Sequence, residues 1–412
     1  MRVCVVGSGG REHALAHVLG RDAEVVVTPG NPGIPGSVST PPEEVDSELF
    51  VVGPEAPLVD GLADRLRAAG RLVFGPGADG ARLEGSKAWM KEVLVDAGVP
   101  TAQHGAFTDE TAALAFLDTM ADLFVVKTDG LAAGKGVVVT EERAEAVDAV
   151  RSYLSGDAFG DAGRTVVIEE GLSGPELSLL AICDGDNAVP LAPAQDFKRI
   201  GDGDIGPNTG GMGAYSPAPV VTQALEQDIM ARVVRPMVAG MAAEGRPIVG
   251  ILYAGLMMTA DGVQLLEVNV RFGDPECQPL MMRLRSDLLP ALVAARDGVL
   301  DKFDLRWHED AALCVVMATK GYPGDYAKGS EIEGLDRAGE IEGVHVFHAG
   351  TEEREGRIHA MGGRVLGITA LGADIAEAQA RAYAAVDAIH WPEGFCRRDI
   401  GWRALGGGGA KT

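Results

Sequence analysis

The sequence predicts an α/β protein built from several domains. Strand-like and helix-like stretches alternate along a chain of 412 residues, which is typical of sheets flanked by helices. Hydrophobic residues make up 46% of the chain, aromatic residues only 5%, and 56 residues are glycine. This composition is typical of soluble α/β enzymes, and the length corresponds to about two to four domains.

Short apolar runs near the start of the chain predict a small parallel sheet, with strands at 2–6, 24–27, 49–52 and 72–74. Helices are expected over 11–19 and 58–69. The segment 35–47 is rich in proline, serine and acidic residues and lacks helical periodicity, so we expect a loop there. Together these elements predict an amino-terminal parallel α/β domain over residues 1–84.

A central domain is expected over 85–101 and 171–305, with a lid subdomain over 102–170 inserted into it. Ser86 is placed to cap a helix that runs to residue 97, and strands at 177–183, 251–258 and 263–268 form the central sheet. The lid pattern consists of strands at 124–127, 137–140 and 165–170 and a helix over 141–154.

The pattern restarts after the central domain. Strands at 311–318 and 364–369 and a helix over 374–388 predict a carboxyl-terminal α+β module over 306–405. The last residues, 406–412, are too rich in glycine to pack and are expected to form a disordered tail.

Charge and cysteine usage narrow the functional class. A formal net charge of −24 disfavours nonspecific binding to nucleic acid or to anionic membranes. The five cysteines lack the spacing of metal ligands, so structural roles are expected. The start of the chain lacks a signal-peptide pattern, and no window supplies the ~18 apolar residues of a membrane span. We therefore expect a cytoplasmic protein.

Glu267, Asn269 and Arg271 form the most informative pattern in the chain. Successive side chains of a strand point to opposite faces, so these three share one face while Val268 and Val270 share the other. Ligand sites favour the carboxyl ends of strands in open α/β sheets. Two oxygen donors at this place suit a magnesium ion whose remaining ligands are phosphate oxygens and water. A solvated edge strand is the plain alternative.

A glycine-rich run, 129–136, follows the strand that ends in Lys127. Its glycines let backbone amides approach phosphate oxygens, and Lys127 and Lys135 can neutralise a triphosphate. It differs from a Walker loop because Val137 begins another strand rather than a helix. A flexible hairpin is an equal alternative.

Further on, Glu169, Glu170 and the amide of Leu172 lie where a strand passes into a connector. These groups could read an adenine edge; two exposed acids are the alternative.

The segment 206–215 is too rich in glycine for a helix or an ordinary strand, so we expect a loop that is either functional or disordered. Asn208 and Thr209 offer amide and hydroxyl groups, and the glycines are expected to expose backbone amides to an anion. Asp196 precedes the loop, together with Lys198 and Arg199. This mixture favours a zwitterionic or phosphorylated substrate.

The turn 7–13 resembles a dinucleotide fingerprint only in part, because Glu12 takes the place of the third glycine. This weakens the case for NAD. A glycine turn at a helix amino terminus still suits phosphate, and Arg11 can strengthen such a site. Pro54 and Glu55 follow a second strand of the same sheet and are expected to face the same crevice, which favours a phosphosugar.

Taken together, these motifs closely resemble the glycinamide ribonucleotide synthetase family of the ATP-grasp superfamily. The resemblance runs from residue 1 to about residue 403 and rests on the following stretches: 7–14, 52–57, 85–87, 127, 129–136, 206–215, 271–276 and 395–403. It implies an ATP-grasp fold with an amino-terminal pre-ATP-grasp domain, an inserted lid and a carboxyl-terminal module.

The resemblance also implies a reaction. Glycine, 5-phosphoribosylamine and ATP would give glycinamide ribonucleotide, ADP and phosphate through glycyl phosphate, in the second step of purine synthesis, with Mg²⁺ or Mn²⁺ as the metal. The partners would be these small molecules, and the chain would be a monomer, with a weak dimer as the alternative. Another ATP-grasp ligase of purine synthesis, using bicarbonate or formate, is the main competing hypothesis. A silent nucleotide sensor and an NAD dehydrogenase are more distant ones.

The resemblance assigns roles residue by residue. Catalysis falls to Arg271, Lys127 and Asp196, and the metal to Glu267 and Asn269. The nucleotide set comprises Lys87, Lys127, Gly130, Gly134, Lys135, Gly136, Glu169, Glu170, Leu172 and Glu176. The substrate set comprises Gly9, Gly10, Arg11, Pro54, Glu55, Asp196, Asn208, Thr209, Gly210, Gly211 and Arg271. Many relatives in the superfamily carry a second metal carboxylate on the preceding strand, but 251–258 contains none.

Overall fold

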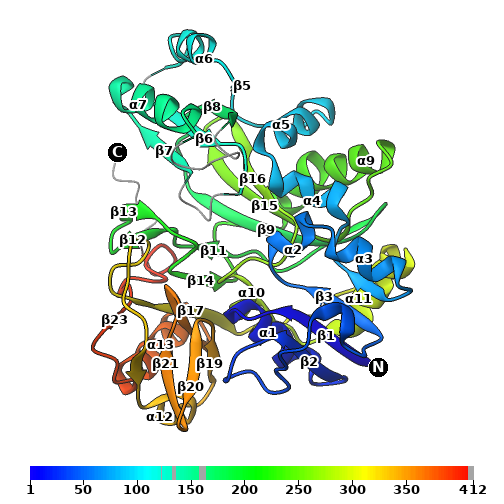
Figure 1. The fold of residues 1–412 in the computed structure, drawn as a ribbon, viewed down its shortest axis with the longest axis vertical. Helices are drawn as coiled ribbons and strands as arrows, with labels where there is room; N and C mark the ends of the chain where they lie inside the picture. The colour runs from blue at the N-terminus through cyan, green and yellow to red at the C-terminus, as the bar shows by residue number, and fades with distance from the viewer. Residues whose placement is uncertain (122, 132–135, 157–163, 407–412) are drawn as a thin grey trace.

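The computed structural model describes residues 1–121, 123–131, 136–156 and 164–406, and Figure 1 shows their arrangement. The predicted positions Gly134 and Lys135, and residues 407–412 of the tail, lie outside the described residues.

The amino-terminal segment forms the predicted parallel sheet, in the order β2-β1-β3-β4. Its strands are β1 (Arg2–Gly7), β2 (Glu24–Pro29), β3 (Leu49–Val52) and β4 (Leu72–Phe74), and its helices are α1 (Gly10–Leu19), α2 (Glu55–Val59), α3 (Leu62–Ala68) and α4 (Ala78–Gly85). A single helix over 58–69 was wrong, because the chain turns at Gly61 with φ +77°, a conformation that glycine adopts easily. The predicted loop 35–47 contains one short 3-10 turn, η1 (Pro42–Glu44).

The central sheet is antiparallel, in the order β10-β9-β15-β16. Its strands are β9 (Glu176–Asp184), β10 (Ala188–Pro190), β15 (Val249–Thr259) and β16 (Gly262–Asn269), which confirms the three predicted strands. We expected Glu267 at the carboxyl end of a strand in an open α/β sheet, where ligands bind. That expectation was wrong about the sheet, because this sheet is antiparallel. Glu267 and Asn269 instead end the second strand of a hairpin whose register shifts beside Gly255.

Helices cover the central sheet and connect it to its neighbours. They are α5 (Lys87–Asp96), α8 (Gln223–Ile229), the π turn η3 (Met230–Val234), α9 (Arg235–Ala243), α10 (Cys277–Arg283) and α11 (Leu288–Asp297), followed by the 3-10 turn η4 (Leu300–Lys302). The Ser86 cap of α5 is confirmed, since its hydroxyl accepts a hydrogen bond from the Trp89 amide at 3.2 Å. The helices between 223 and 243 were not predicted.

The lid segment lies at the top of Figure 1 and has its own small core. Its antiparallel sheet has the order β5-β8-β6-β7. The strands are β5 (His104–Phe107), β6 (Phe124–Thr128), β7 (Val137–Thr140) and β8 (Val166–Glu170), and the helices are α6 (Glu110–Leu117) and α7 (Arg143–Leu154). The predicted strands and helix are confirmed, while β5 and α6 are additional.

The carboxyl-terminal sheet is not confined to residues after 306. Its order is β11-β14-β17-β22-β19, with β23 also paired to β17. The strands β11 (Gln195–Asp196) and β14 (Gly213–Ser216) join β17 (Ala311–Thr319), β22 (Arg364–Gly372), β19 (Val344–His348) and β23 (Gly394–Phe395). The segment 195–216 is thereby fixed to the carboxyl-terminal sheet, and the connection from β11 to β14 contains the hairpin of β12 (Arg199–Gly201) and β13 (Ile205–Asn208).

The remaining carboxyl-terminal elements are two helices and a separate small sheet. They are α12 (Leu335–Gly339), α13 (Ile375–Ala388) and a small sheet of β18 (Ser330–Ile332), β20 (Thr351–Arg354) and β21 (Arg357–Ala360). All five cysteines are free and four of them are buried, as small apolar side chains commonly are. Among the described residues, no helix is both long and apolar enough to cross a membrane.

Candidate active site

A cavity of about 1190 Å³ lies between the lid, the central sheet and the carboxyl-terminal sheet. It gathers most of the predicted site residues from distant parts of the chain. Those that line it are Arg11, Pro54, Glu55, Lys87, Lys127, Gly136, Glu169, Glu170, Leu172, Glu176, Asp196, Asn208, Thr209, Gly210, Glu267, Asn269 and Arg271. Gly10, Gly130 and Gly211 do not line it, and Gly9 lines a smaller adjoining hollow of about 240 Å³.

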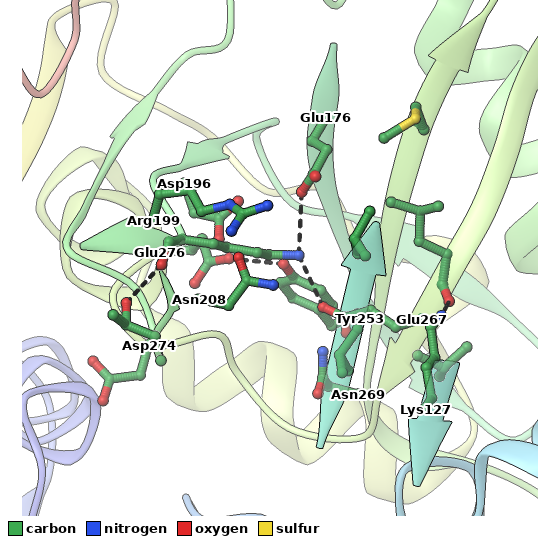
Figure 2. A pocket seen from close by; sticks show the side chains of 18 of the residues that line it. Lys127, Glu176, Asp196, Arg199, Asn208, Tyr253, Glu267, Asn269, Asp274 and Glu276 are labelled. Carbon is green, nitrogen blue, oxygen red and sulfur yellow. Dashed lines mark hydrogen bonds and ion pairs between the residues drawn. The ribbon is translucent and has the colours of Figure 1, made fainter. Parts of the chain in front are cut away.

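Glu267 and Asn269 reach the cavity from the end of β16, as Figure 2 shows. The Glu267 Oε1 lies 3.0 Å from the Nζ of Lys198, and this ammonium lowers the pKa of Glu267 to about 2. The Asn269 Oδ1 accepts a hydrogen bond from Arg271 at 3.2 Å. The donor set fits a magnesium ion as far as it goes, because an ionised carboxylate and an amide oxygen are hard ligands.

The two donors cannot complete a coordination shell. Among the described residues, no group of three or more histidine, cysteine or acidic side chains could hold a metal. A metal here would therefore depend on oxygens from a phosphorylated ligand and from water, as expected for magnesium bound with a nucleotide.

Two lysines stand on the lid side of the cavity. Lys127, at the end of β6, lies 2.7 Å from Glu169 Oε1 through its Nζ. Lys87, at the start of α5, donates to the Gly130 carbonyl at 3.0 Å. Burial and then the neighbouring Lys127 lower the pKa of Lys87. Two cations this close favour a ligand that carries several negative charges.

Glu169 occupies a different environment from the predicted one. Its carboxylate is buried between Lys127 and Lys91, with 2.8 Å from Oε2 to the Lys91 Nζ. Burial would raise the pKa of Glu169, but the two lysines outweigh it and lower that pKa. Burial lowers the pKa of Lys91 to about 8. Lys91 was not among the predicted residues, because it lies inside an ordinary amphipathic helix.

Acidic side chains gather around Lys198 in the same cavity, and Figure 2 labels Glu176, Asp196 and Glu267 among them. Besides Glu267, the Lys198 Nζ approaches Glu176 Oε2 at 3.3 Å. Burial raises the pKa of Asp196 to about 7; Lys198 opposes this shift and Glu276 adds to it. The buried Tyr253 hydroxyl donates to Glu276 Oε1 at 2.8 Å.

Sequence reasoning missed Tyr253, which gives no local signal within an apolar strand.

Arg271 and Arg11 already carry acidic partners. Arg271 pairs with Glu55 at 3.2 Å and with Glu84 at 2.9 Å. The Arg11 Nε lies 2.5 Å from Glu12 Oε1, and its Nη1 donates to the Phe272 carbonyl at 3.1 Å. Both arginines still line the cavity.

The amino terminus of α1 is closed rather than open. The Glu12 Oε2 accepts the Gly9 amide at 2.6 Å. A Cβ at Gly7 would lie 2.6 Å from the Glu12 side chain, and one at Gly53 would lie 2.0 Å from it. The glycines thus make room for the Glu12 carboxylate, which takes up the Gly9 amide in this structure.

The glycine-rich loop also differs from the expectation. Strands β13 and β14 occupy both of its ends. The Gly210 amide donates to the Tyr322 hydroxyl at 3.0 Å, and the Gly211 amide donates to Thr209 Oγ1 at 3.0 Å. Exposed backbone amides were therefore wrong for these two glycines, although Asn208 and Thr209 do face the cavity.

Comparison with known proteins identifies the arrangement. Family models described as the N domain, the ATP-grasp (A) domain and the C domain of phosphoribosylglycinamide synthetase match residues 1–84, 85–277 and 312–403. A phosphoribosylamine--glycine ligase of Brucella melitensis is 52% identical over 421 residues, covering 98% of each chain.

Solved structures agree with the fold. A crystal structure of phosphoribosylamine--glycine ligase from Thermotoga maritima is 32% identical, with a TM-score of 0.87, and covers 97% of this chain and 100% of that one. The biotin carboxylase domain of a Hydrogenobacter thermophilus 2-oxoglutarate carboxylase, in complex with MgADP, ADP and bicarbonate, is 16% identical, with a TM-score of 0.71 over 96% and 91% of the two chains. The ATP-grasp fold predicted from the sequence is confirmed. The chain belongs to the phosphoribosylglycinamide synthetase family.

Proposed function

We propose that this chain joins glycine to 5-phosphoribosylamine in an ATP-dependent reaction that releases ADP and phosphate. The observation that carries the proposal is that Lys87 and Lys127 line the same cavity as Glu267, Asn269 and Asp196. Family membership along the whole chain supports the substrates. An amine does not displace a carboxylate oxygen directly, so the glycine carboxylate must first be activated.

In the first step, a glycine carboxylate oxygen attacks the terminal phosphorus of ATP, forming glycyl phosphate and releasing ADP. Lys87 and Lys127 are proposed to hold the phosphates, with Gly130, Gly134, Lys135 and Gly136 covering them. Glu169 is proposed to act through Lys127, which it fixes by the 2.7 Å ion pair. Positioning and neutralisation of charge account for most of the rate in such transfers.

In the second step, the amine of phosphoribosylamine attacks the glycyl carbonyl and phosphate leaves. The amine nitrogen loses a proton as the amide forms, and Asp196, with its raised pKa of about 7, is suited to accept it near neutral pH. Arg271 is proposed to bind negative charge on the substrate, together with Asn208 and Thr209. A divalent metal between Glu267, Asn269 and the phosphates would supply charge neutralisation.

The finer assignments stay proposals. Glu170, Leu172 and Glu176 are assigned to the nucleoside, and Gly9, Gly10, Arg11, Pro54 and Glu55 to the sugar phosphate, which must be accommodated beside Glu12. Mg²⁺ or Mn²⁺, a cytoplasmic location, a monomeric state and the four-domain division are further parts of the proposal.

Release of ADP tests the function directly. Purified protein is mixed with ATP, Mg²⁺, glycine and phosphoribosylamine formed in situ, and each component is omitted in turn. Rapid ADP release is expected only with all of them present. ADP release that persists with bicarbonate or formate in place of glycine would favour the competing ATP-grasp ligase. Biotin carboxylases, one of which was solved with bicarbonate, have a similar fold.

A further inference from the structure

Two side chains from the carboxyl-terminal segment bind the backbone of Gly210 in the glycine-rich loop, one at its amide and one at its carbonyl. The Gly210 amide donates to the Tyr322 hydroxyl at 3.0 Å, and the Gly210 carbonyl accepts from Arg364 Nη1 at 2.5 Å. Arg364 stands at the start of β22, and Tyr322 lies in the turn after β17. Neither residue carries a signal in the sequence that points to the site.

Arg364 also binds the turn that follows Arg271. Its Nη1 donates to the Asp274 carbonyl at 2.7 Å, and its Nη2 lies 2.9 Å from Asp274 Oδ2. One planar guanidinium therefore connects the loop to the turn. A lysine ammonium cannot reproduce this set of directions, because its donors spring from a single nitrogen.

The glycines of the loop are required by this packing. A Cβ at Gly210 would lie 3.0 Å from the Arg364 Cζ. Gly211 has φ +110°, and a Cβ there would lie 2.5 Å from the Pro275 Cδ. The loop can therefore approach both the arginine and the turn only without side chains.

Both positions belong to the walls of the site. Arg364 and Tyr322 line the large cavity and the adjoining hollow. Asn208 and Thr209, which precede the fixed peptide, line the cavity as well. Lys87 and Lys127 of the proposed phosphate site come from α5 and β6, whereas Arg364 comes from the carboxyl-terminal sheet.

We propose that Arg364 and Tyr322 are positioning residues for the amine and amino-acid side of the reaction. Their hydrogen bonds fix the backbone of Gly210, and the fixed backbone orients Asn208 and Thr209 relative to the turn that carries Asp274. The inference rests on the proposed function, since it assigns this wall to glycine and phosphoribosylamine rather than to ATP. A shift of a positioning group by about 1 Å can cost about 100-fold in rate.

Steady-state kinetics of three variants test the idea. For Arg364→Lys, kcat/KM for glycine and for phosphoribosylamine is expected to fall about 100-fold, with the KM for ATP unchanged. For Tyr322→Phe, which removes only the hydroxyl, a fall of about tenfold is expected. Arg357→Lys is the matched control, because Arg357 is an exposed arginine on β21 of the same segment, and it should leave all constants unchanged.

Hydrogen exchange of the 206–215 segment provides a second readout that does not need turnover. Both site variants should exchange this segment faster than wild type, while the peptides of β6 and α5 keep their protection. Equal losses for ATP and for the amine substrates, or unchanged exchange of the loop, would overturn the proposal. If Arg364→Lys fails to fold, judged by circular dichroism, the milder Tyr322→Phe decides.

The two hypotheses fail in different ways. If wild type shows no glycine-dependent ADP release, the proposed function fails, and the exchange experiment still measures whether the carboxyl-terminal segment orders the loop. If wild type turns over but the loop exchanges equally in all proteins, only the positioning role is lost.

Discussion

Several charged residues of the cavity lie beside a close partner of opposite charge. The Glu267 carboxylate is the clearest case, since Lys198 lowers its pKa to about 2. Lys198 lies between Glu267 and Glu176, so a metal that binds Glu267 must compete with an ammonium that is already in place. Phosphate oxygens from the nucleotide would shift this competition toward the metal.

Replacing Glu267 by alanine should abolish most of the turnover. We expect kcat to fall by about 100-fold or more, because a charge that stabilises the transferring phosphoryl group is lost. The measurement is glycine-dependent ADP release over a range of Mg²⁺ concentrations, with the thermal midpoint as a check on folding. Gln264→Ala on the same strand, outside the cavity, is the control. A near wild-type rate in excess Mg²⁺ would remove Glu267 from the metal site.

Asp196 is expected to give the reaction its pH dependence. Its pKa is raised to about 7, so the basic form needed to accept a proton appears only as the pH rises through 7. We predict that kcat rises with pH through this range in wild type and that Asp196→Asn flattens the rise while lowering the rate about 100-fold. An unchanged profile in the variant would assign the proton transfer to another group.

The raised pKa of Asp196 also makes the free energy of unfolding depend on pH, and this contribution falls as the pH rises. The folded Asp196 binds its proton more tightly than the unfolded residue, whose pKa is 3.8. Between about pH 4 and 7 the folded state therefore holds more protons, so this residue favours folding at the low end and that contribution is lost as the pH rises through 7.

At the scale of elements, Asp129 is one of the residues that join the lid to α5. Asp129 Oδ1 accepts the Ala88 amide at 2.7 Å, and the Ser86 hydroxyl donates to the same carboxylate at 3.0 Å. The start of the glycine-rich run is thus bound to the helix that carries Lys87. The geometry of the two lysines depends on this junction.

Replacing Asp129 by alanine should therefore raise the KM for ATP. We expect about a tenfold increase, together with a loss of about 1 kcal/mol in unfolding free energy, typical of a lost helix cap. Steady-state kinetics and thermal unfolding measure the two effects.

Asp109→Ala is the matched control for this change. Asp109 caps α6 by accepting the Ala112 amide at 2.9 Å, and it lies in the same lid but does not line the cavity. It should cost similar stability and leave the KM for ATP unchanged. An equal rise in both variants would mean that lid stability, rather than the junction, sets nucleotide binding.

Sequence patterns identified the elements and residues whose signals are local. Glu267 and Asn269 share a strand face, and Lys127 directly precedes a glycine-rich run, so neighbouring residues were enough to single them out. Lys91, Tyr253 and Arg364 each stand within an ordinary helix or strand. Their partners, among them Glu169, come from segments far away in the chain, and only the packing of the sheets brings them together.

Helix boundaries failed for a similar reason. The break at Gly61 depends on a left-handed conformation that a hydrophobic pattern does not encode. The strand β14 was missed because its pairing partner, β17, begins almost a hundred residues later. Its glycine content alone argued against a strand, and the tertiary pairing outweighed that propensity.

At the scale of the whole molecule, histidines join the first helix to the carboxyl-terminal sheet. His13 and His17 of α1 face His345 and His348 of β19, with ring centroids 4.4 Å apart between His17 and His345. The His348 amide donates to His13 Nδ1 at 2.9 Å. Burial lowers the pKa of His13 to about 2 and those of His345 and His348 to about 4.

This interface should weaken in mild acid. The unfolded histidines take up protons below about pH 6.5, while the folded ones stay neutral until about pH 4. Stability is therefore full above pH 6.5 and is lost as the pH falls toward 4. We predict that His345→Phe reduces the loss between pH 7 and 5 by about 1 kcal/mol, measured by thermal unfolding.

The control for this prediction is His359→Gln, because His359 is only partly buried on β21 and lies outside the histidine cluster. Burial and the nearby Arg21 already lower the pKa of His17, so His17 keeps part of the dependence in the variant. Identical pH slopes for wild type, His345→Phe and His359→Gln would locate the acid sensitivity elsewhere.

The Glu12 side chain fills the space at the amino terminus of α1 where a phosphate would otherwise bind. In the hollow formed by Gly7, Gly9 and Gly53 this side chain acts as an internal substitute for a bound anion, since it already accepts the Gly9 amide. A nucleotide phosphate could bind the Gly9 amide there only by displacing the Glu12 carboxylate. The turn most similar to a dinucleotide site is thus occupied by the chain itself, whereas Lys87 and Lys127 present their ammonium groups to a polyphosphate in the large cavity.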